Sequence, residues 1–396
     1  MSKVMSINAG SSSLKFQLFE MPEEKVLISG NVERIGFEDA YFTTKLNGEK
    51  KKEVLPIKNH GEAVSKLLKA LVEMKVVNDL NEIKGIGHRV VHGGELFNKS
   101  TKVIEGTIEN LKTISDLAPL HNPAAIVGYE AFKEALPNAG HVLVFDTAFH
   151  SQMPKLSYMY ATPYEWYENY GVRKYGAHGT SHAYVSDEAI KYLNLGSDSK
   201  VITCHIGNGA SVSAVLGGKC LDTSMGFTPL SGVMMGTRTG DIDPAVVTYV
   251  MKKTGMSAEE VLNSFNKKSG LLGVSGISSD SRDVEEAAAQ GNERAILAQD
   301  MQVRSIVRTI GMYYTELGGC DAIVFTAGLG ENNTELRKSV CKQLETTLGT
   351  FIDEKSNNCR GEFKVISSEN SKVKVMVIPT NEELVIARDT NRLLGL

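Results

Sequence analysis

Arginine, histidine and aspartate residues stand beside glycine-rich turns at several points of this chain, a combination suited to binding anions. Arg89 and Val91 share one face of a strand expected over 84–91, just ahead of Gly93 and Gly94. A guanidinium group binds a carboxylate through two hydrogen bonds, while a valine beside it can pack against a methyl group. A structural ion pair would use the same arginine, so the residues alone leave both interpretations open.

Four further residues carry groups suited to phosphoryl transfer. Asp146 follows an apolar run, 142–145, and ligands in α/β proteins bind at the carboxyl ends of strands. Arg238 lies in a glycine-flanked loop, 236–241, where a mobile charge could close over a phosphoryl group. His121 and His178 also lie in turn-rich segments, and an ordinary surface role is the alternative for each of these loop residues.

Glycine-rich turns that could receive phosphate follow apolar strands three times. The first turn separates strands expected over 4–7 and 14–18 and is followed by Lys15, and the second separates 201–206 from 212–215. The third, 328–332, precedes a helix. None has the Walker A pattern or a complete G-x-G-x-x-G, so tight turns remain the alternative for any one of them. Two strand–turn–strand units half a chain apart predict an internal repeat.

The elements that must position these groups alternate between strands and helices. We expect strands at 84–91, 141–145, 322–326 and 373–378, and helices at 62–77, 243–253 and 257–265, from 280 with an interruption at Gly291, and from 336 to a stop at Gly349. Capping-box spacing marks helix starts at Ser257 and Thr380. Segment 153–175 lacks a period and is interpreted as an irregular connector, followed by a loop, 175–182. This alternation predicts two α/β domains with mixed sheets.

Composition excludes several classes of protein. A chain of 396 residues is long enough for two domains, and its 42% hydrophobic and 23% charged residues are typical of globular proteins. The net charge of −4 gives no basic surface for nucleic acid. The five cysteines have no C-x-x-C spacing, which favours reduced thiols in a cytoplasmic protein. No apolar stretch predicts a membrane span or signal peptide.

These segments together closely resemble the acetate kinase family, within the superfamily of acetate and sugar kinases, heat-shock ATPases and actin. The resemblance runs nearly end to end and is carried by INAGSSSLKF at 7–16, GHRVVHGG at 87–94, LAPLHNP at 117–123, VFDTAFH at 144–150, YGAHGTSH at 175–182, CHIGNGAS at 204–211, GTRTGDIDP at 236–244, FTAGLGEN at 325–332 and IPTNEEL at 378–384.

The resemblance implies an actin-like (ribonuclease H-like) ATPase fold of two domains, with mixed sheets flanked by helices. Residues 1–150 would bind the acyl substrate and phosphate, with a last helix, about 383–396, packing back on them, and residues 151–382 would bind nucleotide. The implied reaction is reversible, direct in-line transfer of the ATP γ-phosphoryl group to acetate, giving acetyl phosphate and ADP. Mg²⁺ is the implied metal, with Mn²⁺ as an alternative, and the implied assembly is a homodimer.

The resemblance also assigns residues to roles. Arg89 would bind the acetate carboxylate, and Val91, Leu120 and Pro229 would line the methyl pocket. Arg238 and His178 would stabilise the phosphoryl group in transit, with His121 close by, and Asp146 would be a further catalytic residue. Asn8 and Glu382 would hold the metal. The nucleotide and its phosphates would be surrounded by Lys15, His205, Ile206, Gly207, Asn208, Gly209, Asp280, Ser281, Arg282, Gly328, Leu329, Gly330, Glu331 and Asn332.

Two alternatives remain. Ala177 stands where relatives carry phenylalanine, which favours a larger acyl pocket and a propionate or butyrate kinase, whereas Val91 favours acetate. A slow, nucleotide-driven clamp of the actin or heat-shock type would need no carboxylate-binding arginine. Within the kinase, Asp146 is expected to orient an arginine or a metal-bound water, because a carboxylate substrate is already ionised at pH 7.

Overall fold

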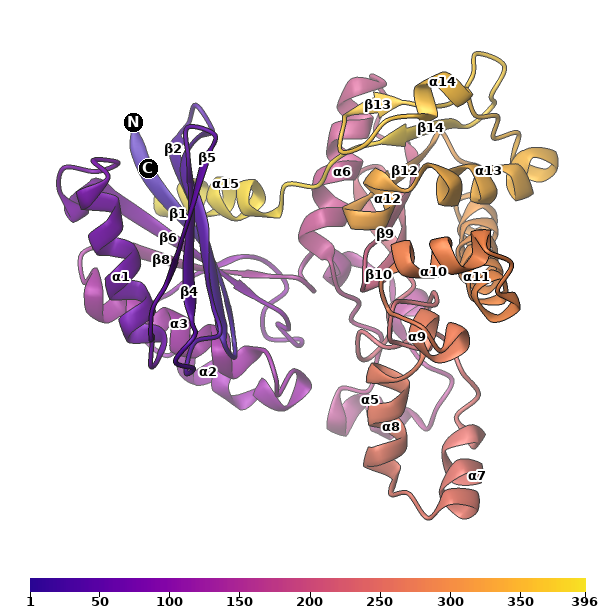
Figure 1. Cartoon of the computed structure of the whole chain (residues 1–396), viewed down its shortest axis with the longest axis horizontal. Coiled ribbons are helices and arrows are strands. Elements are labelled where there is room, and N and C mark those ends of the chain that lie inside the picture. The colour runs from indigo at the N-terminus through magenta and orange to yellow at the C-terminus, as the bar shows by residue number, and fades with distance from the viewer. The chain divides into compact units, whose positions relative to one another are not determined.

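The computed structural model describes residues 1–396 and divides the chain into two compact units (Figure 1). Unit 1 comprises Met1–Ala148 together with Asn381–Leu396, and unit 2 comprises Phe149–Thr380. The chain therefore leaves unit 1 after Ala148 and returns to it at Asn381. No helix of the chain has the length and apolarity needed to cross a membrane.

Unit 1 is built on an eight-stranded mixed sheet in the order β5-β4-β3-β2-β1-β6-β8-β7. An antiparallel meander runs through β1 (Ser2–Gly10), β2 (Ser13–Met21), β3 (Lys25–Glu33), β4 (Tyr41–Leu46) and β5 (Glu49–Val54). β6 (Ile83–Val90) pairs parallel with β1, β8 (Gly140–Phe145) pairs parallel with β6, and the short β7 (Thr101–Lys102) closes the edge antiparallel to β8.

Helices cover both faces of this sheet because the central strands have apolar residues pointing to each face. Leu143 and Phe145 pack with residues of α2 (Thr107–Thr113) and α3 (Asn122–Ala135), and α1 (His60–Glu73) buries its apolar stripe against the β1–β4 meander. Val142 and Val144 pack instead against Ile386 of α15 (Glu382–Leu394). Short 3₁₀ turns at Leu80–Glu82 and Ser115–Leu117 complete the unit.

Glycines in β6 and β8 allow α15 to approach the sheet closely. A Cβ atom on Gly87 would lie 2.3 Å from Thr390 Oγ1, and one on Gly140 would lie 2.7 Å from the Leu394 methyl carbons. Side chains at these two positions would therefore push the helix away from the sheet. The C-terminal helix is thus an integral layer of the N-terminal unit.

Unit 2 contains a six-stranded mixed sheet in the order β11-β10-β9-β12-β14-β13. Its strands are β9 (Lys200–Ile206), β10 (Ala210–Leu216), β11 (Lys219–Thr223), β12 (Ala322–Thr326), β13 (Lys364–Val365) and β14 (Lys374–Val377). α6 (Gly179–Tyr192) packs on one face, and α11 (Glu293–Leu317) and α13 (Thr334–Leu348) pack on the other. The remaining helices are η3 (Phe149–Gln152), α4 (Lys155–Tyr158), α5 (Tyr164–Tyr170), α7 (Ala245–Thr254), α8 (Ala258–Lys267), α9 (Gly270–Ser275), α10 (Ser281–Ala289), α12 (Ala327–Asn332) and α14 (Glu354–Asn357).

The predicted internal repeat is confirmed at the level of topology. The order β3-β2-β1-β6-β8 in unit 1 corresponds to β11-β10-β9-β12-β14 in unit 2, with an antiparallel meander followed by two parallel strands in each. The predicted α/β class with two mixed sheets flanked by helices is confirmed with it. The expected strands and the helix starting at Ser257 are also found, the latter with a complete capping box.

Four local predictions were wrong. The connector 153–175 contains the short helices α4 and α5, and the loop 175–182 already enters α6 at Gly179. The third glycine-rich turn is itself a helix, α12. The last helix is capped by Asn381, whose side chain accepts from the Leu384 N–H, and not by Thr380.

Candidate active site

A buried ion pair stands at the carboxyl ends of two parallel strands in unit 1. Arg89, near the end of β6, donates from Nε to Asp146 Oδ1 at 3.0 Å and from Nη2 to Asp146 Oδ2 at 2.6 Å. Asp146 follows β8 directly and is 1% exposed, whereas the Arg89 side chain is 25% exposed. The pair uses two of the five guanidinium N–H groups, so three remain directed elsewhere.

The surroundings of the pair shift the pKa values of both residues. For Arg89 the main cause is a nearby negative charge, and for Asp146 it is burial. The Asp146 charge raises the pKa of Arg89 further above its usual value, and Glu382 and Glu383 add to this effect. Burial raises the pKa of Asp146, although Arg89 opposes the change. A carboxylate so thoroughly buried remains charged only while its arginine stays in place.

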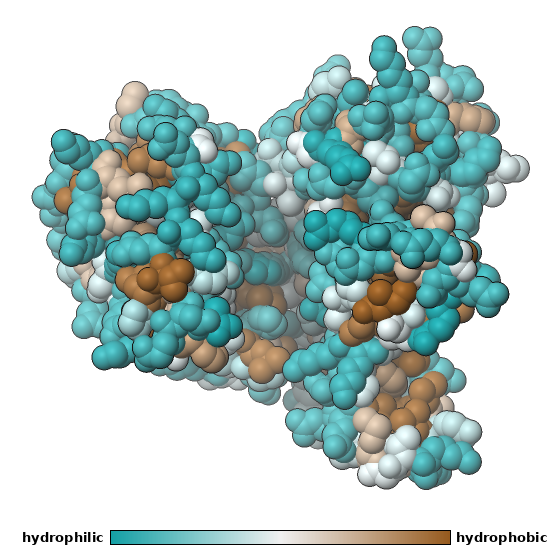
Figure 2. Space-filling view, in the orientation of Figure 1, coloured by the Kyte–Doolittle hydropathy of each residue, from teal (hydrophilic) through white to brown (hydrophobic).

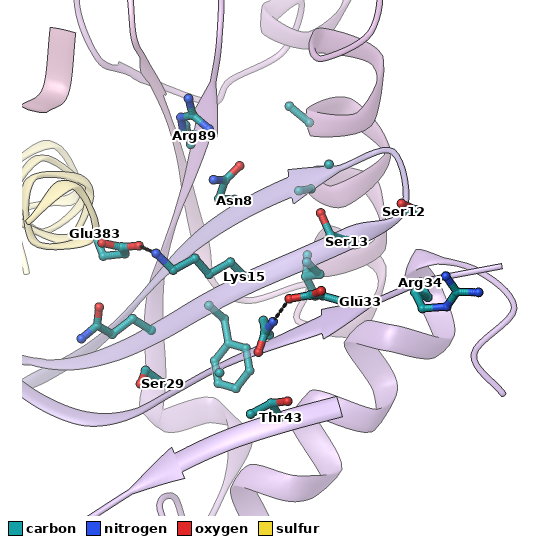
Figure 3. A pocket seen from close by; sticks show the side chains of 18 of the residues that line it. Asn8, Ser12, Ser13, Lys15, Ser29, Glu33, Arg34, Thr43, Arg89 and Glu383 are labelled. Carbon is teal, nitrogen blue, oxygen red and sulfur yellow. Dashed lines mark hydrogen bonds and ion pairs between the residues drawn. The ribbon is translucent and has the colours of Figure 1, made fainter. Parts of the chain in front are cut away.

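A cavity of about 1060 Å³ in unit 1 opens in front of Arg89 (Figure 3). Val91, His121 and Ala125 line it beside Arg89, so the predicted carboxylate-binding arginine and one predicted methyl contact share one cavity. The predicted contact Leu120 is 70% exposed and does not line this cavity. Residues of the β1–β5 meander, between Asn8 and Lys50, and Glu383 form the rest of the wall.

Two of the predicted metal and phosphate groups of unit 1, Asn8 and Lys15, line the same cavity, whereas Glu382 does not. Asn8 on β1 and Lys15 on β2 are paired across the hairpin, and Figure 3 shows Asn8 close to Arg89. Lys15 forms an ion pair with Glu383 in the first turn of α15. Glu382, its neighbour, is close enough to Arg89 and Asp146 to shift the pKa of both.

In unit 2 the second glycine-rich hairpin brings His178 and Arg238 together. A Cβ on Gly209 would lie 3.5 Å from His178 Nε2 and also 3.5 Å from Arg238 Nη1, so both side chains lie against the backbone of the β9–β10 turn. Arg238 donates from Nη1 to the Pro229 carbonyl at 3.0 Å, and burial lowers the pKa of its guanidinium. His178 has a left-handed backbone, φ +59°, immediately before α6.

The nucleotide residues predicted from the sequence divide into two groups. A cavity of about 610 Å³ in unit 2 is lined by Asn208, Asp280, Ser281, Arg282, Gly328, Leu329 and Asn332, together with Ser279, Glu285, Asn333 and Arg360. His205, Ile206, Gly207, Gly209, Gly330 and Glu331 do not line it. Ile206 belongs to the apolar core, and His205 stacks on His178 with ring centroids 4.1 Å apart.

Glu331 turns its carboxylate back toward the end of β12. Glu331 Oε1 accepts from the backbone N–H groups of Ala327 at 2.9 Å and Thr380 at 3.1 Å. Ala327 has a left-handed φ of +65°, unfavourable for any residue with a Cβ. The side chain of Glu331 therefore fixes the start of α12 and does not face the cavity.

Sequence reasoning missed Arg337, which is fully buried on α13. Its guanidinium has no carboxylate partner and donates to the carbonyls of Gly330 at 2.9 Å, Asn357 at 2.7 Å and Cys359 at 2.9 Å. It thereby ties α12 to the segment that precedes Arg360, on the wall of the nucleotide cavity. Its position beside Leu336 on the apolar helix face was the only available signal.

Comparison with known proteins agrees with this geometry. The model of the Acetokinase family matches residues 3–388. An acetate kinase of Bacillus velezensis is 59% identical over 394 residues, covering 99% of this chain and all of that protein. The solved acetate kinase of Porphyromonas gingivalis is 45% identical to this chain, with a TM-score of 0.95 over both full chains. A solved propionate kinase from Francisella tularensis is 42% identical with a TM-score of 0.93, and the match covers 99% of this chain and all of that chain. The chain belongs to the acetokinase family.

Proposed function

We propose that this chain catalyses the reversible transfer of the ATP γ-phosphoryl group to acetate, yielding acetyl phosphate and ADP. The observation that carries the proposal is the Arg89–Asp146 pair at a cavity shared with Val91. The full-length similarity to the Bacillus velezensis acetate kinase supports the same substrates.

Acetate would bind through the N–H groups of Arg89 that Asp146 leaves available. The bidentate contact with Asp146 fixes the plane of the guanidinium, so the remaining donors are oriented before the substrate arrives. Val91 and Ala125 on the cavity wall would contact the methyl group. Leu120 and Pro229 stay predictions as further methyl contacts.

Charge neutralisation would supply most of the catalysis. A carboxylate and a triphosphate repel one another, and phosphoryl transfer is accelerated chiefly by positioning and by cations around the equatorial oxygens. Arg238 and His178, packed together at Gly209, would contact the phosphoryl group in transit. His121 keeps the catalytic role that the sequence predicts. We assign Asp146 to orienting Arg89, because both of its oxygens already accept from that residue.

A divalent cation fits the donors near Arg89. Asn8 and Glu382 offer one amide and one carboxylate oxygen, and the chain has no cluster of three or more metal-binding side chains. Mg²⁺ is commonly held by one or two protein oxygens together with water and substrate phosphates. Bound there, Mg²⁺ or Mn²⁺ would neutralise phosphate charge, while Lys15 would add a further cation.

ADP or ATP would occupy the 610 Å³ cavity of unit 2. Asp280 caps α10 by accepting from the Arg282 N–H at 2.9 Å, which fixes the backbone of Ser281 on the cavity wall. Gly328 has no neighbour within 4 Å of a hypothetical Cβ, so a ligand can approach its backbone.

Hydroxylamine trapping tests the proposal, because it converts acetyl phosphate to a hydroxamate. We expect hydroxamate only with acetate and ATP, its loss in Arg89→Ala, and full activity in Arg392→Ala, an exposed arginine paired with Asp389. Acetate-independent ATP hydrolysis with no hydroxamate would instead support a nucleotide-driven clamp.

A propionate or butyrate kinase is the second candidate, favoured by the similarity to the Francisella propionate kinase. Ala177, however, packs within the apolar core of unit 2. Relative kcat/KM for acids of two to four carbons decides between the candidates. Since one methylene is worth roughly 1–3 kcal/mol, acetate should lead by about 10-fold or more.

We further propose that the chain is a cytoplasmic homodimer. α7 buries none of its residues although Val246, Val247 and Val250 are apolar, and Tyr249 beside them is 64% exposed. Brown, apolar surface is visible over α7 and α8 in Figure 2. Sedimentation equilibrium of wild type and Tyr249→Glu would test this, with a monomeric wild type contradicting it.

A further inference from the structure

Four histidines of unit 2 cluster around the start of α6, and the mechanism above uses only His178. His182 lies one turn into α6, and His205 lies on β9. His150 lies in η3, and its ring centroid is 5.7 Å from that of His182. The strand register sets Ser211 of β10 opposite His205 and Ser213 opposite Thr203.

A continuous chain of hydrogen bonds connects this buried cluster to His178. Thr203 Oγ1 lies 2.7 Å from His182 Nδ1, and His182 Nε2 lies 2.7 Å from Ser211 Oγ. Ser211 Oγ in turn lies 2.9 Å from His178 Nδ1. Thr203, His182 and Ser211 are all completely buried, so water does not compete for these bonds.

Only two arrangements of protons satisfy such a chain when His182 carries a single N–H. Burial, with the neighbouring His150 and His205, lowers the pKa of His182 well below its usual value, so its ring is neutral. Either every donor points toward His178, or every donor points toward Thr203. The hydroxyl of Ser211 donates to one histidine and accepts from the other in both cases.

The end of the chain at Thr203 distinguishes the two directions. Thr203 Oγ1 has no hydrogen-bond partner other than His182. If the donors pointed toward Thr203, its own O–H would be a buried donor with no acceptor, which costs about 1–3 kcal/mol. If they point toward His178, the Thr203 O–H donates to His182 Nδ1 and only a hydroxyl lone pair is left unused.

We infer that the Thr203–His182–Ser211 relay fixes His178 as a neutral imidazole protonated on Nε2, which makes these three buried side chains positioning residues for phosphoryl transfer. Ser211 donates to His178 Nδ1, and His178 Nε2–H lies against the backbone of Gly209, where Arg238 Nη1 also lies. The inference rests on the proposed function for its catalytic consequence: His178 presents a hydrogen-bond donor to an anion without having to gain a proton.

Nuclear magnetic resonance of the full chain labelled with ¹⁵N-histidine reads the tautomer directly. Two-bond ¹H–¹⁵N correlations separate a protonated nitrogen from an unprotonated one, and a His178→Asn sample assigns the signals. We expect Nε2 to be protonated and Nδ1 unprotonated at His178. A His178 ring protonated on Nδ1, or on both nitrogens at neutral pH, overturns the inference.

Kinetics of Ser211 variants provide a second readout with a matched control. Ser211→Ala removes the donor to His178, whereas Ser213→Ala removes an equally buried hydroxyl on the same strand that bonds Thr223 at 2.8 Å. Losing a phosphoryl donor costs about 10²–10³ in kcat, and losing only its orientation should cost less, about 10-fold. We expect that loss in kcat for Ser211→Ala with KM for acetate unchanged, recovery in Ser211→Thr, and wild-type rates in Ser213→Ala.

Equal kcat values for Ser211→Ala and Ser213→Ala would overturn the positioning role. The tautomer measurement requires no substrate, so its result stands independently of the proposed function. A correct tautomer in a chain that forms no acetyl hydroxamate would refute the proposed function and leave the relay intact.

Discussion

The Asp146 carboxylate directs both oxygens at Arg89, which leaves it poorly placed to remove a proton from anything else. An amide at this position could accept only through one oxygen and would leave the arginine without its counter-charge. We expect Asp146→Asn to lower kcat/KM for acetate by about 100-fold, because a misdirected guanidinium misplaces the substrate.

Activity of Asp146→Asn across pH, with and without an added base such as imidazole, separates orientation from proton abstraction. No recovery is expected under either condition. A rate that returned at high pH or with the added base would show that Asp146 serves as a base. Thermal unfolding of the variant should accompany the assay, since breaking a buried pair costs about 3–5 kcal/mol of stability.

Arg238 lies against the backbone of Gly209, as does the Nε2 edge of His178. Because an arginine that stabilises a transferring phosphoryl group contributes about 10³–10⁵ to the rate, Arg238→Ala should lose kcat on that scale. KM for ATP should change far less. Added guanidinium should restore part of the rate, and a variant retaining more than a tenth of wild-type kcat would contradict this role.

At the scale of elements, the backbone at the ends of helices and strands forms part of the site, as side chains do. α12 begins at a left-handed Ala327 that is held by the Glu331 carboxylate. Glu331→Gln weakens that hold by about 1.4 kcal/mol, the scale of a charged hydrogen bond, and should raise KM for ATP about tenfold. Ala327→Gly removes the backbone strain, so the double variant should regain near-normal KM.

Steady-state kinetics of the two single variants and the double variant measure this coupling. Independent roles for the two residues would leave the double variant as impaired as Glu331→Gln alone. That outcome would contradict the assignment of Glu331 to holding the start of α12.

Helix and strand interiors were predictable, whereas their junctions were not. Helical spacing relates the apolar residues Leu336, Val340, Leu344 and Leu348, and all four lie within α13. Arg337 is an exception to the rule that charged residues face water. Its buried guanidinium is stabilised because it donates hydrogen bonds to three carbonyls from outside its own helix. A glycine-rich motif at 327–332 resembles a loop locally, and the long-range contact between Glu331 and the Thr380 N–H cannot be read from it.

The candidate site was likewise predictable where a local sequence pattern marked a residue, and not where contacts between elements decide its role. Asp146 was identified from its place after an apolar strand, and that signal is local. The relay behind His178 joins a helix and two strands, so no local pattern marks it. Strand alternation could have set Thr203 and His205 on one face of β9, and Ser211 and Ser213 on one face of β10, but not the helix that joins them.

For the molecule as a whole, buried histidines predict loss of stability in mild acid. Burial lowers the pKa of His141 in unit 1 and of His150 in unit 2 from 6.5 to about 4. The unfolded chain binds these protons first, so the stability is fully present above pH 6.5 and is lost as the pH falls toward 4. At pH 5 the loss is roughly 2 kcal/mol for each histidine.

Urea unfolding at pH 7 and pH 5 measures this difference in the free energy of unfolding. The hydrogen bond from Lys3 lowers the pKa of Glu82 to about 2, so this carboxylate is ionised in the folded state and mostly ionised in the unfolded state over this range, and it contributes little. Equal free energies at the two pH values would contradict the neutral burial of His141 and His150.

The position of α15 affects how the polypeptide matures on the ribosome. Unit 2 is one uninterrupted stretch, and all of it is synthesised before the segment Asn381–Leu396. Unit 1 is translated first, yet Val142 and Val144 lack their cover until Ile386 arrives. Unit 1 therefore cannot complete this layer until unit 2 has been synthesised, and its apolar sheet face must be kept from contacting other proteins in the meantime.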